Sequence, residues 1–110
     1  MLRVCGISLI VACAVNSVVH AATPERITGN FVGCKSRDDL SRLVDLATDA
    51  DKDAFGKFAA PRILAGTCHL WKPGQEAFVI EVAQLAGVTC LRPKDGVDCF
   101  WTPQEAMQSR

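Results

Sequence analysis

The N-terminal 21 residues constrain this chain most, because they have the three-part organisation of a cleaved export signal. Arg3 provides the charged start, residues 4–15 form the apolar run, and Val19 and Ala21 place small groups at the −3 and −1 positions of a signal-peptidase site. We therefore expect a signal peptide over residues 1–21, and a periplasmic or secreted protein that begins near Ala22.

The apolar run has two other interpretations. It ends at Asn16-Ser17, well short of the roughly 20 residues that a spanning helix needs, which argues against a membrane anchor. Residues 10–13 resemble a bacterial lipobox, in which Cys13 would carry a lipid and anchor the protein as a lipoprotein. Apolar residues continue after Cys13, where a polar tether would follow, so soluble export is the favoured interpretation.

Four cysteines remain in the exported chain, and this even number predicts two disulfides in an oxidising compartment. We expect residues 88–92 and 97–101 to form a hairpin around a turn at 93–96, in which Cys90 lies directly opposite Cys99. Cys34 and Cys68 then pair by elimination. Zinc is the alternative, but structural zinc sites draw on closely spaced ligands, and here only Cys68 and His69 are neighbours.

The charge balance excludes one class of partner. The chain has 12 basic and 12 acidic side chains, and loss of Arg3 with the signal leaves about one net negative charge. A chain with this net charge lacks the excess of basic residues that binding to nucleic acid or to an anionic membrane requires. The exported chain is also short enough to form a single domain with a modest core, which disulfides would stabilise.

A helical half is predicted over residues 34–66, after an extended leader over residues 22–33 with at most one short strand at 26–32. Ser36 is a good N-cap, and Asp39 occupies the capping-box position. One helical face follows at residues 40, 43, 44 and 47. A second helix should begin at Asp51 and stop or kink at Pro61, with a further turn that Gly66 ends.

From residue 67 the apolar period changes to two, which predicts a β half over residues 67–110. The expected strands are 67–71, 76–83, 88–92 and 97–101, and residues 72–75 have Pro and Gly where a type II turn requires them. Thr102, Pro103 and Glu105 then occupy the N-cap, N1 and N3 positions of a brief terminal helix.

Strand alternation predicts a recognition surface. If Cys68 and Leu70 face the helices, Trp71 faces outward, and the same alternation turns Leu91 and Phe100 outward. With the neighbouring Arg92, these side chains have the composition of a binding hot spot. The alternative is that the leader or the terminal helix covers this tentative binding patch, which consists of Trp71, Leu91, Phe100 and Arg92.

No motif indicates a catalytic residue, a metal site or a cofactor. Asp49, Asp51 and Asp53 have the opening spacing of a calcium loop, but Ala54 and Ala60 replace its glycine and its bidentate glutamate. His69 alternates with Cys68 to opposite faces of a strand, so these neighbours cannot form a nucleophile and base pair. The carboxylates mostly lie at helix starts, where they cap or are solvated.

Residues 67–106 resemble the meander of small bacterial SH3-like barrels, through the Pro-Gly turn, the acidic Gly turn and the step from Phe100-Trp101 to Thr102-Pro103. The wider pattern, with Gly33-Cys34, the helix pair and Gly66-Thr67-Cys68, is similar to small exported proteobacterial proteins of unassigned function. This resemblance implies an α+β fold, with an N-terminal helical hairpin on a four- to five-stranded antiparallel SH3-like barrel and a short C-terminal helical turn.

Three functional hypotheses follow from the sequence. The first is a non-catalytic exported interaction module that binds a protein or a cell-wall peptide. The second is a secreted inhibitor or immunity-type protein that plugs an enzyme, because a small disulfide-stabilised domain suits a rigid interface. The third is a small periplasmic hydrolase. No cofactor, nucleic acid or membrane partner is expected, unless Cys13 is lipidated.

Overall fold

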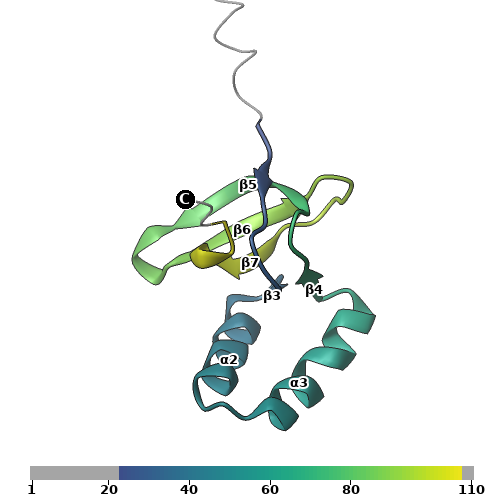
Figure 1. The fold of residues 1–110 in the computed structure, drawn as a ribbon, viewed down its shortest axis with the longest axis vertical. Helices are drawn as coiled ribbons and strands as arrows, with labels where there is room; N and C mark the ends of the chain where they lie inside the picture. The colour runs from purple at the N-terminus through teal and green to yellow at the C-terminus, as the bar shows by residue number, and fades with distance from the viewer. Residues whose placement is uncertain (1–22, 108–110) are drawn as a thin grey trace, which may run out of the picture.

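The computed structural model describes residues 23–107, which form two α-helices and one six-stranded antiparallel sheet (Figure 1). The α+β class is therefore present. The predicted signal peptide, with Cys13, lies outside the described residues. In chain order the elements are β2 (Glu25–Arg26), β3 (Phe31–Cys34), α2 (Arg37–Thr48), α3 (Lys52–Ala65), β4 (Cys68–Trp71), β5 (Glu76–Ala83), the 3-10 turn η1 (Gln84–Ala86), β6 (Val88–Pro93), β7 (Phe100–Pro103) and the 3-10 turn η2 (Gln104–Met107).

The sheet is open, and the expected closed barrel is not formed. Its strands pair in the order β2-β5-β6-β7-β3-β4, so β2 and β4 are its two edges within residues 23–107. The region expected to be an extended leader supplies two of these strands. β3 pairs with both β4 and β7, and β2 pairs with the start of β5.

The sheet curls strongly although it stays open. β4 lies at one edge and β5 lies beside the other, yet only residues 72–75 connect them. Gly74 in this connection has a φ of 87°, which the expected type II turn requires. The curl encloses one core, here called the inner face, to which both edges and η2 contribute. Its buried residues are Ile27, Trp71, Ala77, Leu91, Phe100 and Ala106.

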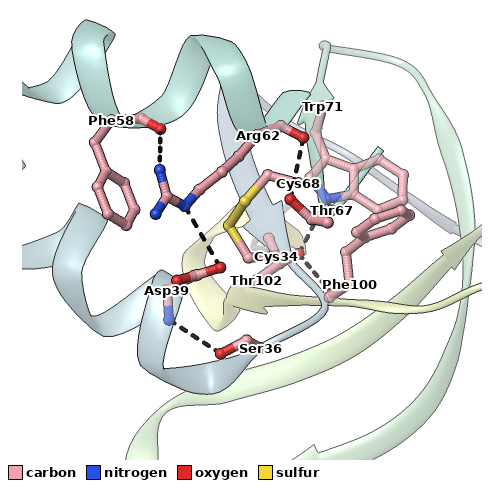
Figure 2. Close-up of a disulfide and its surroundings, with 10 residues drawn as sticks. All are labelled: Cys34, Ser36, Asp39, Phe58, Arg62, Thr67, Cys68, Trp71, Phe100 and Thr102. Carbon is pink, nitrogen blue, oxygen red and sulfur yellow. Dashed lines mark hydrogen bonds and ion pairs between the residues drawn. A yellow bond between two sulfur atoms is a disulfide. The ribbon is translucent and has the colours of Figure 1, made fainter. Parts of the chain in front are cut away.

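Trp71 is the largest fully buried side chain of this inner face. Its Nε1 donates to Thr102 Oγ1 at 3.0 Å, and the Thr102 hydroxyl donates to the Phe100 carbonyl oxygen at 3.0 Å (Figure 2). A Cβ on Gly33 would overlap the Thr102 hydroxyl and lie 3.0 Å from Trp71 Nε1, so only glycine fits there. Thr102 is therefore a buried strand residue, and its expected role as a helix N-cap is wrong.

The opposite, outer face of β3 and β4 carries the two helices. Cys34 and Cys68 are directly opposite neighbours on these strands and form a disulfide at the point where the helices leave the sheet (Figure 2). A bridge over this sequence separation of 34 stabilises a fold by about 4 kcal/mol in the chain-entropy description. Leu40 and Leu43 of α2 and Ala59 of α3 pack against it in a second buried cluster.

Local capping sets the ends of both helices. The Ser36 hydroxyl accepts from Asp39 N, and the Asp51 carboxylate accepts from Ala54 N, which confirms both expected N-caps. Gly66 ends α3 in the left-handed conformation, with a φ of 82°. Of the two outcomes expected at Pro61, the stop is wrong, since α3 continues through Pro61 to Ala65. Packing of Phe58 and Ile63 against the outer-face cluster outweighs the missing backbone donor.

The second disulfide joins Cys90 to Cys99, as expected, but the hairpin register differs. Cys90 lies opposite Trp101, and Leu91 lies opposite Phe100, because β7 begins only at Phe100. The expected strand over 97–101 is therefore wrong, and Val97 is 89% exposed in a loop. The observed partner of Cys90 is two residues further along the chain than the expected one, Cys99. A shift by an even number of residues keeps Leu91 and Phe100 on the same face of the sheet, whereas a shift by one residue would place them on opposite faces.

The inner core predicts that a buried and an exposed apolar side chain contribute very differently to the free energy of unfolding. Trp71→Ala should lower the free energy of unfolding by about 3–5 kcal/mol, because it leaves a cavity and removes the indole donor from the buried Thr102 oxygen. Val97→Ala should change it by less than about 0.5 kcal/mol. Chemical denaturation measures both. A loss below about 1 kcal/mol for Trp71→Ala would show that the inner face is solvated and that this core is wrong.

Candidate functional site

The predicted recognition patch is buried. Trp71 and Leu91 are 0% exposed and Phe100 is 8% exposed, so these three side chains are core residues and not a surface. Alternation assigned them correctly to the face opposite Cys68. That face is covered by Ile27, which follows β2, and by Ala106 of η2. The covering of the patch by the leader and the terminal turn, which was the alternative interpretation, is what the structure shows.

Arg92 has a local structural role. Its Nη1 donates to the Gly96 carbonyl oxygen at 2.9 Å, and its guanidinium lies 5.0 Å from the centre of the Phe78 ring. Gly96 N also donates to the Pro93 carbonyl oxygen at 2.9 Å. Arg92 therefore braces the loop between β6 and β7 and does not border an aromatic patch.

His69 lies half-buried against the inner aromatic residues. Its ring contacts Trp71 edge-on at 4.4 Å and stacks on Phe100 at 5.3 Å between centroids. Burial lowers the pKa of this imidazole below its ordinary value, and its Nε2 lies 3.0 Å from Gln75 Nε2. Because the Gln75 amide oxygen accepts from Lys72 N, its amide nitrogen donates to the ring, which favours neutral His69.

Among residues 23–107, no three His, Cys, Asp or Glu side chains gather where they could hold a metal ion. The four cysteines in this range are all in disulfides. No helix of the same region has the length and apolarity to cross a membrane. Two disulfides are what an oxidising compartment permits, so the structure is consistent with export.

An apolar groove lies on the outer face, between α2, the β3 and β4 strands and the start of η2. We call it the α2 groove. It has a volume of about 560 Å³, within the range of ordinary ligand pockets. Two of its apolar side chains are well exposed, Val44 at 43% and Leu70 at 40%. Its lining residues are Asn30, Phe31, Val32, Leu40, Leu43, Val44, Ala47, Thr48, Phe55, Leu70, Pro103 and Glu105.

Four of the twelve lining residues were readable from the sequence, since Leu40, Leu43, Val44 and Ala47 were expected on one helical face. In the structure Leu40 and Leu43 are buried, whereas Val44 is 43% exposed. The contribution of Phe31 and Val32 was missed, because β3 had been assigned to a leader.

A second group of exposed apolar residues lies on β5. Val79 is 40%, Ile80 is 54% and Val82 is 48% exposed, and a register irregularity separates Val79 from Glu81. Within the described part of the chain, β2 pairs only with Glu76 and Ala77, so the rest of β5 has no partner on that side. This surface has exposures like those of the α2 groove and provides matched control positions.

The buried imidazole predicts a pH dependence of stability. The folded pKa of His69 lies below the unfolded value of about 6.5, so between these two values the unfolded state binds more protons. The contribution of His69 to the free energy of unfolding is therefore fully present above pH 6.5, and it is lost as the pH falls from 6.5 toward the folded pKa. The difference in unfolding free energy between wild type and His69→Gln should shrink from pH 7.5 to 5.5. A constant difference would contradict the burial of a neutral ring.

No family model, curated protein or solved structure matches this chain.

Proposed function

We propose that this domain is a non-catalytic exported interaction module that binds a protein or a cell-wall peptide through the α2 groove. The single observation that supports it is the exposed apolar lining of this groove, to which Val44 of α2 and Leu70 of β4 both contribute. Contiguous exposed apolar surface of this kind is typical of interaction sites, whereas single exposed residues are not.

The fold suits such a role. The inner face is closed by its own chain segments, and the groove is built on elements that a disulfide ties together at Cys34 and Cys68. A rigid, preorganised surface loses less conformational entropy on binding. We also propose that the curled sheet is a distant, open variant of the SH3-like arrangement, and that the chain is related to small exported proteobacterial proteins.

An inhibitor or immunity-type protein is the second candidate, and one observation favours it. The loop between β6 and β7 is braced by the Cys90 to Cys99 disulfide, by Arg92, and by a 3.0 Å ion pair between Lys35 and Asp98. At its tip Val97 is 89% exposed. A braced loop that presents one apolar side chain could enter a small enzyme pocket.

We do not propose the hydrolase. The polar side chains that line the α2 groove are those of Asn30, Thr48 and Glu105, and the Thr48 hydroxyl donates to the Val44 carbonyl oxygen. His69 alternates with Leu70 and therefore lies on the opposite face of β4. The described residues thus bring no base and nucleophile together at the groove.

Capture from periplasmic extract and on purified peptidoglycan tests the proposed site. Val44→Glu should weaken retention of the partner by at least about tenfold, because it places an unpaired charge in the apolar groove. Val82→Glu introduces the same charge at a similarly exposed position on β5 and should leave retention unchanged.

The two candidate functions give different results in this assay. Loss of capture with Val97→Asp, but not with Val44→Glu, would favour the inhibitor and reject the α2 groove. Loss with Val82→Glu alone would move the interaction surface to β5. Each variant changes an exposed position, so thermal unfolding should confirm that all three remain folded.

A further inference from the structure

We propose that two copies of this domain form a weak dimer by antiparallel pairing of the free part of β5. This inference is independent of the α2 groove, because none of the residues that line the groove belongs to β5. It follows from the free length of β5, from the exposed apolar side chains there, and from the position of its bulge.

The free part of β5 is its last six residues, 78–83. β2 pairs with β5 only at Glu76 and Ala77, so beyond these two residues β5 has a strand on its β6 side alone within the described region. Three of the six side chains are large, apolar and 40–54% exposed: Val79, Ile80 and Val82. An open apolar edge of this kind presents unpaired backbone groups to which a strand of another chain pairs.

A hollow of about 350 Å³ lies beside this edge. Val79, Val82 and Thr89 line it, and Glu25 of β2 and Met107 of η2 border it. The segments that cover the rest of the inner face therefore stop short of the free part of β5. A strand added to β5 would place its inward side chains at this hollow.

The register of the sheet assigns a face to the residues of the free edge. Val79 lies opposite Leu91 and Val82 lies opposite Thr89, and opposite residues share a face. Leu91 belongs to the inner core, and Thr89, two residues away, shares its face. Both valines are therefore on the inner face, and by the same reasoning the residues at the two ends of the span are on the outer face. Strict alternation would separate the valines, but Ile80 is skipped in the register, as in a β-bulge.

The bulge makes this pattern symmetric about the centre of the span, between Ile80 and Glu81. When two copies pair all six residues about a two-fold axis, Val79 of each copy lies opposite the second copy's Val82, and both side chains are on the inner face. The two ends pair in the same way on the outer face. Glu81 lies opposite the second copy's Ile80, so that like charges are not opposite each other. In a strand without the bulge, this pairing would set inner residues against outer ones.

This self-complementarity identifies a second copy as the occupant of the edge, since an isologous interface uses the same patch on both subunits. Bulges and charges usually protect an edge from pairing, but here the bulge lies at the same place in both strands and does not interrupt the match. β5 ends at Ala83, and β2 of the other copy begins opposite Ala77, one residue beyond the span, so the two strands do not overlap.

The interface is small. Six residues span about 20 Å, and a strip one strand wide buries much less than the roughly 1,600 Å² of a standard interface. We therefore expect a dissociation constant of about 0.1 mM.

Sedimentation velocity between about 5 µM and 1 mM tests this dimer, a range that brackets the expected dissociation constant. The protein is expressed as the full chain and purified with its disulfides formed. Its weight-average mass should rise with concentration toward twice that of the monomer. Ile80→Glu should weaken association by at least about tenfold, because it places a carboxylate opposite the second copy's Glu81 at two points. Ile80→Lys places an ammonium group there and should leave association as strong as in the wild type, or stronger.

Val44→Glu, an exposed position in the α2 groove, is the control and should not change association. Ile80 is 54% exposed, so thermal unfolding should show that both of its variants remain folded. In the wild type, protection of the Val79 and Val82 amides from hydrogen exchange should increase with protein concentration.

Four outcomes would overturn the dimer. The first is a monomer mass over the whole concentration range. The second is association that Val44→Glu weakens and Ile80→Glu does not, which would assign it to the α2 groove. Equal weakening by Ile80→Glu and Ile80→Lys would show that Glu81 does not lie opposite position 80, and the register would be wrong. Amide protection that is independent of concentration would show that β5 is covered by this chain's own terminal residues.

Discussion

Burial of the Trp71 side chain is the interaction on which the rest of this structure depends. The indole comes from the edge strand β4, bonds to Thr102 of β7, and packs with Ile27 from the other side of the curled sheet. An aromatic side chain of this size buries about 150–250 Å², which a small domain cannot replace easily. This contact joins the two sides of the open sheet, and backbone hydrogen bonds from Gly74 N to the Ile27 carbonyl and from Thr28 N to the Ala106 carbonyl support the same curl.

The closed inner face determines where a partner can bind. Because residues next to β2 and in η2 cover it, the exposed large apolar side chains lie elsewhere, on the helices and β4, along β5, and singly at Leu85 and Val97. On the outer face the two helices bury Leu40, Leu43 and Ala59 but leave Val44 and Leu70 exposed. The α2 groove is thus the part of the outer face that the two short helices leave uncovered.

Signals that depend on neighbouring residues were readable from the sequence. The caps at Ser36 and Asp51, the strand over residues 76–83 and the turn at Gly74 all follow from local chemistry, and the structure has them. The Cys90 to Cys99 pair was also predicted, although through a register that is two residues off. In the β6 to β7 connection, local chemistry predicts where the chain turns and which residues share a face of the sheet, but not how many residues the loop contains.

Signals that depend on distant residues were not readable. β3 pairs with β4 and β7, which lie beyond the whole helix pair in the chain. No local pattern in residues 31–34 predicts these partners. The same limit explains the error about Trp71, Leu91 and Phe100. Alternation tells which residues share a face of a strand, but only the complete fold tells whether that face meets solvent or Ile27 and Ala106.

Methyl NMR of the domain with the partner recovered by capture, or with soluble peptidoglycan fragments, locates the interaction surface most directly. Binding at the α2 groove should change the chemical shifts of the methyl groups of Val44 and Leu70, and should leave those of Val79, Ile80 and Val82 on β5 unchanged. Shifts confined to the β5 residues, or spread over Leu91 in the inner core, would contradict it.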